Sequence, residues 1–156
     1  MAVSDRIAAH FRENVFWGGL TYNAHPMCLA AALAAVEVVV EEKLVERSAR
    51  MGEVMRGHME RMAARHRSVK EHRNIGLFGT IELRRNAAGD RLVPYGGSHP
   101  AMAQLGKFLR DNGLFTMLQW STVMCNPPLC IDEAQMDEAF GIIDRALAIT
   151  DAAFTP

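Results

Sequence analysis

The residues best suited to chemistry lie at positions 16 to 26, in the sequence FWGGLTYNAHP. This stretch combines two glycines, the hydroxyl group of Thr21, aromatic rings and a proline, and it runs directly into the alanine-rich sequence MCLAAALAAVEVVVEE. A helix N-terminus offers unpaired backbone N–H groups and a partial positive charge, which suit a phosphate or a carboxylate. The stretch therefore predicts either an anion-binding loop or a turn before a core helix, and the local pattern alone favours the turn because no G-x-x-x-x-G-K-[ST] motif is present.

The cysteines and the overall charge exclude several classes of function. The three cysteines, Cys28, Cys125 and Cys130, form an odd set without a Cys-x-x-Cys pair, which is typical of a reducing compartment, and we expect no metal site. The net charge of −1 gives no electrostatic reason to expect nucleic acid or an anionic membrane as a partner. Glu37 interrupts the longest apolar run, and the first residues lack the features of a signal peptide, so a cytoplasmic location is expected.

Helical periodicity predicts three main helices. The sequence PMCLAAALAAVEVVV is apolar nearly all round, so it predicts a helix buried against other structure. After Glu42 this first helix continues as an amphipathic, solvent-facing half, and a second helix, HPAMAQLGKFLRDNG, begins after Ser98 with a proline in its first turn. A capping-box pair introduces the C-terminal helix. The apolar stripes of the first amphipathic helix and of the C-terminal helix are Leu44, Met51, Met55, Met59 and Met62, and Met136, Phe140, Ile143 and Leu147.

Alternating side chains predict short strands between these helices. LFGTIEL, at positions 77 to 83, has the period of a strand, and RLVPY, at 91 to 95, is expected to pair with it as an edge strand after the turn NAAGD. LFTMLQW and TVMC predict two more strands. The resulting order indicates an α+β layer from about residue 65 onward. Residues 1 to 25 are too few to cover the first apolar helix, so we expect the chain to be incomplete at its N-terminus.

Three sequence blocks, in this order and spacing, carry a family resemblance. GGLTYNAHPMCLAAALAAVEVVVEEKLVER, NIGLFGTIEL and NPPLCIDEAQMDEAFGIIDRAL resemble the C-terminal part of class III pyridoxal-phosphate-dependent aminotransferases, which include omega-amino acid, taurine and beta-alanine transaminases. The resemblance covers essentially the whole chain and is nearest to the taurine–pyruvate-like branch. It implies an α+β fold, namely the C-terminal small domain of a fold-type I transferase with an antiparallel sheet and packed helices, preceded by the tail of the large domain.

The resemblance also implies roles for the loop that precedes the first long helix. The threonine of the LTY block, Thr21, would reach across the interface of a homodimer and bind the phosphate of the other subunit's pyridoxal 5'-phosphate. Its neighbour Leu20 would line the partner's substrate pocket. A hydroxyl with nearby backbone donors suits a phosphate oxygen, and glycines allow the backbone to come close.

Two departures from the family pattern concern the catalytic lysine and the substrate. The family's lysine forms a Schiff base with the cofactor, but Lys43, Lys70 and Lys107 stand in other contexts and are each expected to be solvated side chains, so we predict no catalytic residue in this chain. Many relatives carry an arginine that binds a substrate carboxylate where this chain has Met117. Trp120 remains as a candidate substrate contact, although it is equally consistent with an ordinary strand residue.

The resulting hypothesis divides the chain into residues 1 to 45, the tail of the large domain with a buried helix, residues 46 to 66, the continuation of an inter-domain helix, and residues 67 to 156, the small domain. The full-length protein would transfer an amino group from an amine or omega-amino acid to a keto acid such as pyruvate. The alternative is a non-catalytic α+β module that binds a ligand or a protein partner.

Overall fold

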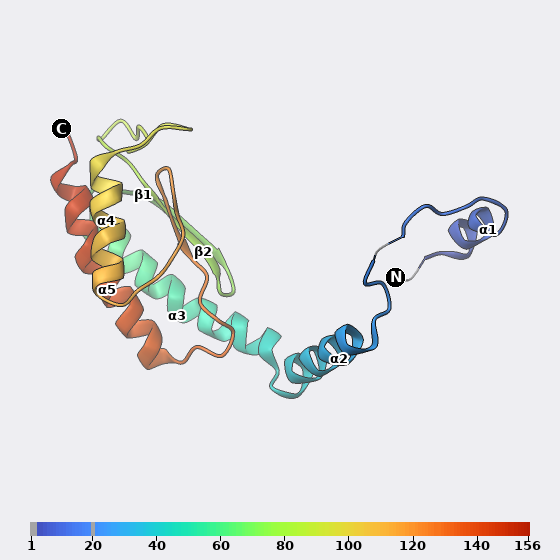
Figure 1. The fold of residues 1–156 in the computed structure, drawn as a ribbon. Coiled ribbons are helices and arrows are strands. Elements are labelled where there is room, and N and C mark those ends of the chain that lie inside the picture. The colour runs from blue at the N-terminus through green and yellow to red at the C-terminus, as the bar shows by residue number, and fades with distance from the viewer. Residues whose placement is uncertain (1–2, 20) are drawn as a thin grey trace. The chain divides into compact units, whose positions relative to one another are not determined.

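The computed structural model describes residues 3 to 19 and 21 to 156. It divides the chain into two compact units, Met1–Val38 and Val39–Pro156, which are described here one at a time. The helices and strands are α1 (Asp5–Glu13), α2 (Pro26–Glu41), α3 (Leu44–Arg65), β1 (Val69–Ile75), β2 (Phe78–Leu83), α4 (Pro100–Asp111), β3 (Leu118–Gln119), β4 (Thr122–Cys125) and α5 (Glu133–Ala152) (Figure 1). None of the helices in the described part of the chain combines the length and the apolar character that crossing a membrane requires.

The long apolar helix α2 forms as the sequence predicts, but nothing in the described residues buries it. No residue of α2 is buried, and side chains such as Met27, Leu29 and Leu33 are 57 to 76% exposed. Its many alanines, together with leucine, explain why the segment is helical, because both residue types have high helix propensity. The described residues of the first unit contain no buried side chain that could form a core with it.

We expect the isolated chain to self-associate through this helix. Its exposed apolar side chains include Met27, Leu29, Leu33, Val36 and Val40, and monomers seldom expose a contiguous apolar patch of more than a few hundred Å². Sedimentation velocity at tens of micromolar protein should therefore show dimers or larger species, and a Leu29→Glu, Leu33→Glu variant should shift the distribution towards monomer. A sharp monomer peak for the unmodified chain would show that α2 does not drive association.

The second unit is built on α3, which the sequence predicts as a continuation of the preceding helix. The structure separates the two helices at Lys43, whose φ of 50° lies in the left-handed region and cannot continue an α-helix. The stripe predicted from periodicity is confirmed, since Met51, Met55, Met59 and Met62 are each at most 2% exposed. One face of α3 therefore lies in the core and the opposite face carries charged residues.

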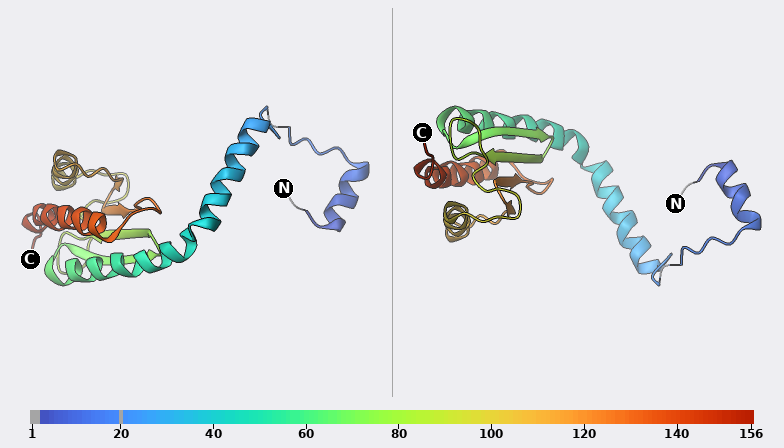
Figure 2. Two further views of the ribbon diagram at one scale, coloured as in Figure 1. Left: turned by 90° about the horizontal axis from the view of Figure 1, so that it is seen from below. Right: turned by 90° about the horizontal axis from the view of Figure 1, so that it is seen from above.

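The sheet has the strand order β1-β2-β4-β3 and is antiparallel throughout. The predicted strand at 77 to 83 is confirmed, but its hairpin partner is β1, not RLVPY, of which only Arg91 makes an isolated bridge to Arg84. α3 packs against β1 and against α5, while α4 packs against α5 (Figures 1 and 2). The core between these helices and the sheet contains Ile81, Leu83, Val123, Leu105, Leu109, Phe140 and Leu147.

Two helix starts show how local sequence positions the ends of this core. The capping box predicted for α5 is present, because Asp132 accepts a hydrogen bond from the Gln135 backbone and the Gln135 side chain accepts one from Asp132. For α4 the N-cap is His99 rather than Ser98, and its Nδ1 accepts the Ala101 N–H at 3.1 Å. An imidazole nitrogen thus takes the role that a Ser, Thr, Asn or Asp side chain most often has at a helix N-cap.

Because α3 lies close to the β1–β2 turn at Gly52, a larger residue at this position should destabilise the fold. A Cβ atom added to Gly52 would lie 2.6 Å from the Gly76 backbone, and Asn74 donates hydrogen bonds to the carbonyls of both glycines at 2.8 Å. Gly52→Ala should therefore lower the free energy of unfolding by about 1 to 3 kcal/mol. The control Gly57→Ala, where only the Arg61 side chain lies within 4 Å, should be neutral or stabilising. Urea denaturation of both variants tests this, and equal midpoints would contradict it.

Candidate functional site

Thr21 lies in the first unit, at the start of a turn over residues 21 to 24 that leads into α2. The turn is closed by a hydrogen bond from the His25 N–H to the Tyr22 carbonyl at 3.3 Å, and Ala24 has a φ of 55°. Thr21 is exposed, so its hydroxyl group is accessible to a ligand. Leu20, which is predicted to line the substrate pocket of the other subunit, lies outside the described residues.

The three lysines are exposed, as the sequence predicts. Lys43 lies in the short link between α2 and α3, and Lys70 belongs to the edge strand β1, which the sequence analysis does not predict. Lys107, on α4, forms an ion pair with Asp111 at 2.5 Å. A Schiff-base lysine needs an environment that favours its neutral form, such as burial or a neighbouring cation, and these exposed positions do not provide burial.

Met117 and Trp120 lie in the second unit, at the two ends of the short strand β3. Met117 is 59% exposed, and its carbonyl accepts the Met124 N–H at 3.0 Å. Trp120 is partly buried against the core, has a φ of 49° and lies against the Tyr95 ring, with the ring centroids 4.4 Å apart. The indole thus contacts the core and Tyr95, whereas the Met117 side chain faces solvent.

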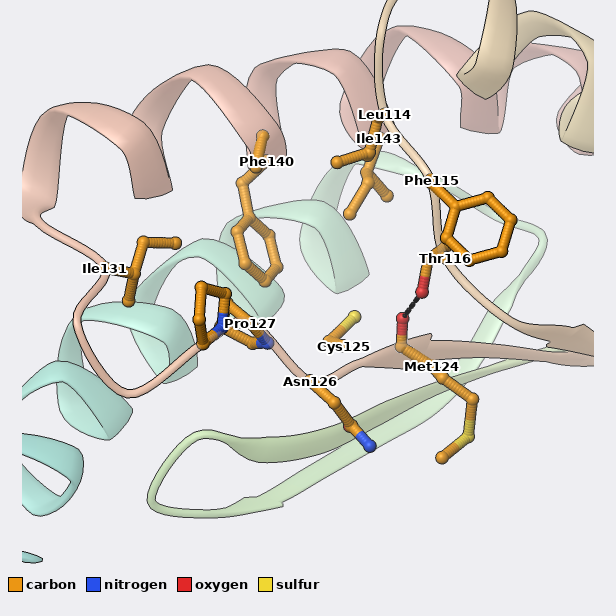
Figure 3. A pocket seen from close by; sticks show the side chains of 12 residues that line it. Leu114, Phe115, Thr116, Met124, Cys125, Asn126, Pro127, Ile131, Phe140 and Ile143 are labelled. Atoms are coloured by element: carbon orange, nitrogen blue, oxygen red, sulfur yellow. Dashed lines mark hydrogen bonds between the residues drawn. The ribbon is translucent and has the colours of Figure 1, made fainter. Parts of the chain in front are cut away.

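A pocket of about 210 Å³ lies next to this hairpin (Figure 3). It is formed by the segment before Met117, the end of β4, the NPPL sequence and the inner face of α5. The hydroxyl group of Thr116, which lines the pocket, is already engaged, because it donates a hydrogen bond to the Met124 carbonyl at 2.5 Å. The side chains around it are Leu114, Phe115, Thr116, Met124, Cys125, Asn126, Pro127, Pro128, Ile131, Ala139, Phe140 and Ile143.

The chemistry that this pocket allows is that of an uncharged, mainly apolar site. Burial raises the pKa of the Cys125 thiol to about 12, so the thiol stays protonated and is a poor nucleophile. The sequence from Leu114 to Ile131 contains no charged residue. The sequence analysis did not identify this pocket, although its NPPL motif marks one wall of it.

Two arginines of the second unit, Arg73 and Arg110, do not replace the carboxylate-binding arginine that relatives carry at the position of Met117. Arg73, on β1, contacts Glu71 at 2.8 Å and Glu82 at 3.6 Å. Arg110 is an exposed residue in the last turn of α4. Within the described residues of the second unit, the structure therefore brings neither guanidinium into the pocket of Figure 3.

The comparisons with known proteins agree on one family. The model of the family "Aminotransferase class-III" matches residues 2 to 147. The putrescine–pyruvate aminotransferase of Pseudomonas aeruginosa is 30% identical over 144 residues, which cover 88% of this chain and 30% of that protein.

Solved structures give the same result for the fold. The taurine:2-oxoglutarate aminotransferase of Bifidobacterium kashiwanohense, determined in complex with PLP and glutamate, matches with a TM-score of 0.89 and 30% identity, over 96% of this chain and 34% of that one. An (S)-enantioselective omega-transaminase of Thermomicrobium roseum matches with a TM-score of 0.83 and 28% identity, over 95% of this chain and 33% of that one. The chain thus spans about a third of the length of these relatives. Class III aminotransferases depend on PLP, and the present chain belongs to this family.

Proposed function

We propose that this chain is the C-terminal part of a PLP-dependent aminotransferase that transfers an amino group from an amine or omega-amino acid to a keto acid such as pyruvate. The observation that carries the proposal is the family match, which extends over residues 2 to 147. In this proposal residues 1 to 45 complete a large domain, residues 46 to 66 form the inter-domain helix and residues 67 to 156 are the small domain. The protein would act as a homodimer, and a cytoplasmic location stays a prediction.

The residues of this chain fit one part of a PLP site, the phosphate clamp. Thr21 is exposed, stands in a turn directly before a long helix and can donate its hydroxyl proton to a phosphate oxygen of the partner subunit's cofactor. PLP itself would supply the electron-withdrawing ring that stabilises negative charge on the substrate carbon. The lysine that holds the cofactor would lie outside these 156 residues, because Lys43, Lys70 and Lys107 are all exposed.

The exposed apolar helix α2 supports the same assignment. Its side chains lack a partner within the described residues of the first unit, and the chain spans only about a third of its relatives. A large domain contributed by further sequence would cover α2. This arrangement would account for a helix that is apolar nearly all round.

The uncharged segment around Met117 gives the proposal a substrate preference. A bidentate arginine recognises a carboxylate, and the sequence from Leu114 to Ile131 has no cation that could replace it. An amine donor without a carboxylate at this position would not need that arginine for binding. We therefore place simple amines and diamines ahead of omega-amino acids as donors.

The experiment uses a chain extended upstream to the length of its relatives, with the 156-residue chain as control. Each is incubated with PLP, pyruvate and one amine, and alanine formation is measured. The extended chain should form alanine, with a higher kcat/KM for a diamine than for an omega-amino acid of equal length, and the control should form none. Failure of the extended chain with every amine would contradict the transaminase assignment, while a preference for omega-amino acids would contradict only the donor preference.

A further inference from the structure

Three arginines of the second unit gather at the C-terminal end of α3, where the last residues of the sequence also lie (Figures 1 and 2). Arg67 comes two residues after α3, and Arg84 and Arg91 face each other in an isolated antiparallel bridge beyond β2. The second unit begins at Val39, near the other end of α3, and the 22 residues of this helix place its ends about 30 Å apart. Arg67, Arg84 and Arg91, here named the arginine cluster, take no part in the proposed aminotransferase chemistry.

The Phe154 ring brings two of the three guanidinium groups together. The guanidinium carbon of Arg67 lies 5.1 Å from the ring centroid, and that of Arg84 lies 5.9 Å from it. Both distances are within the range of a cation–π interaction. The segment that carries the ring is fixed by a hydrogen bond from the Thr155 N–H to the Arg85 carbonyl at 2.7 Å. Two cations therefore share one aromatic ring.

Backbone carbonyl groups orient the same two side chains. Arg67 donates from Nε and Nη2 to the Asp151 carbonyl at 3.2 and 2.8 Å, at the end of α5. Arg84 donates from Nε to the Arg67 carbonyl at 2.9 Å. A guanidinium group has five N–H donors, so within the described part of the chain these bonds leave three donors on Arg67 and four on Arg84. A ligand that accepts from these donors has little side-chain freedom left to restrict.

Arg91 adds a like charge directly opposite Arg84. Residues opposite one another in an antiparallel bridge project from the same side, with Cβ atoms about 4.5 to 5.5 Å apart, and like charges in such a pair are destabilising. Among the residues that the structure describes, the Arg91 guanidinium belongs to none of the ion pairs. An anion bound between the two side chains would replace this repulsion with two attractive contacts.

The carboxylates beside the arginine cluster have other partners. Asp90, next to Arg91 in sequence, contacts Arg85 at 3.0 Å. The Asp151 carboxylate contacts Nδ1 of His66 at 2.7 Å. For residues 3 to 19 and 21 to 156, no ion pair within 4.0 Å includes a member of the arginine cluster. The cluster thus concentrates positive charge that these residues do not neutralise.

We propose that the arginine cluster and the Phe154 ring form a binding site for a phosphate dianion, either inorganic phosphate or the phosphate group of a monoester. Guanidinium groups bind phosphate through forked pairs of N–H···O hydrogen bonds. The oxygens of one phosphate group can accept from several guanidinium groups at once, and its double charge offsets most of the charge of the cluster. A single carboxylate has two oxygens and one negative charge, so it matches the cluster less well.

The experiment follows the backbone amide signals of the 156-residue chain by 1H–15N NMR during titration with inorganic phosphate. The pH is kept at about 7.5, where phosphate groups are mainly dianions, and chloride keeps the ionic strength constant. The amides of the arginine cluster and Phe154 should shift along one saturable curve, with a Kd of about 1 mM or lower. Linear shifts without saturation would overturn the proposal.

Arg91→Gln is the main variant, because its side chain makes no ion pair that the described fold would lose. Hydrogen bonds to charged groups are strong, so the phosphate Kd should rise about tenfold or more, and Arg84→Gln should have at least the same effect. Arg110→Gln is the matched control, because it removes an equal charge from an exposed position in the last turn of α4. It should change the Kd less than about threefold, since only the general charge of the chain differs. Equal changes in Arg91→Gln and Arg110→Gln would overturn the site.

Thermal unfolding provides a second measurement with a different sign. Without phosphate, Arg91→Gln should keep or raise the Tm, because it removes the like-charge pair with Arg84. Added phosphate should raise the Tm of the unmodified chain more than that of Arg91→Gln, since only the unmodified chain binds the ion well. Phosphate also stabilises proteins in general, so the difference between the two chains is the quantity that reports on the site. An equal rise in both chains would overturn the proposal.

A comparison of three anions identifies the ligand chemistry. Tighter binding of glycerol 3-phosphate than of inorganic phosphate would assign the site to phosphate monoesters, and the reverse order would assign it to free phosphate. Succinate, a dianion built from two carboxylates, should bind at least about tenfold more weakly than the better phosphate ligand. Succinate binding of equal strength would overturn the assignment to phosphate.

Discussion

Met59→Ala should be among the most destabilising single substitutions in the second unit. Met59 is 0% exposed and belongs to the cluster of α3 methionines packed against β2, where its Cε would lie 2.7 Å from a Cβ on Gly79. Removing its side chain leaves a cavity that the surrounding strands can fill only in part. The free energy of unfolding should fall by about 2 to 5 kcal/mol.

Urea denaturation followed by circular dichroism measures this effect as a lower midpoint with an unchanged slope. Met117→Ala is the matched control, because Met117 is 59% exposed and its loss should change the free energy of unfolding by no more than about 0.5 kcal/mol. Equal midpoints for the two variants would contradict the assignment of the methionine stripe to the core.

Thr21→Ala, in a chain extended upstream to include the cofactor lysine, should weaken PLP retention. Thr21 would give one hydrogen bond to a doubly charged phosphate, and hydrogen bonds to charged groups contribute about 1.5 to 3 kcal/mol each. Its loss should raise the cofactor Kd about ten- to a hundredfold. Thr21→Ser keeps the hydroxyl group and should remain close to the unmodified enzyme.

The alternative role of Thr21, as a turn residue, predicts a different result. Thr21→Ala would then lower the Tm of the apoprotein and leave the Kd for PLP nearly unchanged. Heterodimers with a lysine-free subunit separate the two cases further. If retention is the same whether the substitution lies on the lysine-bearing subunit or on its partner, Thr21 does not act across the interface.

The elements with a strong hydrophobic period were predictable from the sequence. The methionine stripe of α3 and the capping box of α5 depend on local patterns, and both are present. Strand β1 was missed because its sequence, VKEHRNI, has only one buried residue, Val69, and forms by pairing with β2 across a turn at Gly76, whose φ is 52°. RLVPY was expected to pair back as an edge strand after the NAAGD turn, but Leu92 and Val93 are both buried, so the segment does not alternate as a strand does.

The candidate site was predictable only where a motif marks it. Thr21 and Met117 were identified through the family resemblance, whereas the pocket of Figure 3 is formed by three neighbouring segments, within residues 114–143, that only the fold brings together around a cavity. The exposure of α2 was also unpredictable from its own composition. An apolar helix is expected to be buried, but its own sequence does not say which part of a protein supplies the covering surface.

The most direct test of the aminotransferase assignment is to locate the PLP attachment site. The extended chain is incubated with PLP, reduced with borohydride, digested and mapped by mass spectrometry. We expect one stoichiometric label on a lysine upstream of Met1 and no stoichiometric label on Lys43, Lys70 or Lys107, because these exposed side chains lack an environment that favours a stable Schiff base. Stoichiometric label on any of these three lysines, or on no lysine at all, would contradict the assignment.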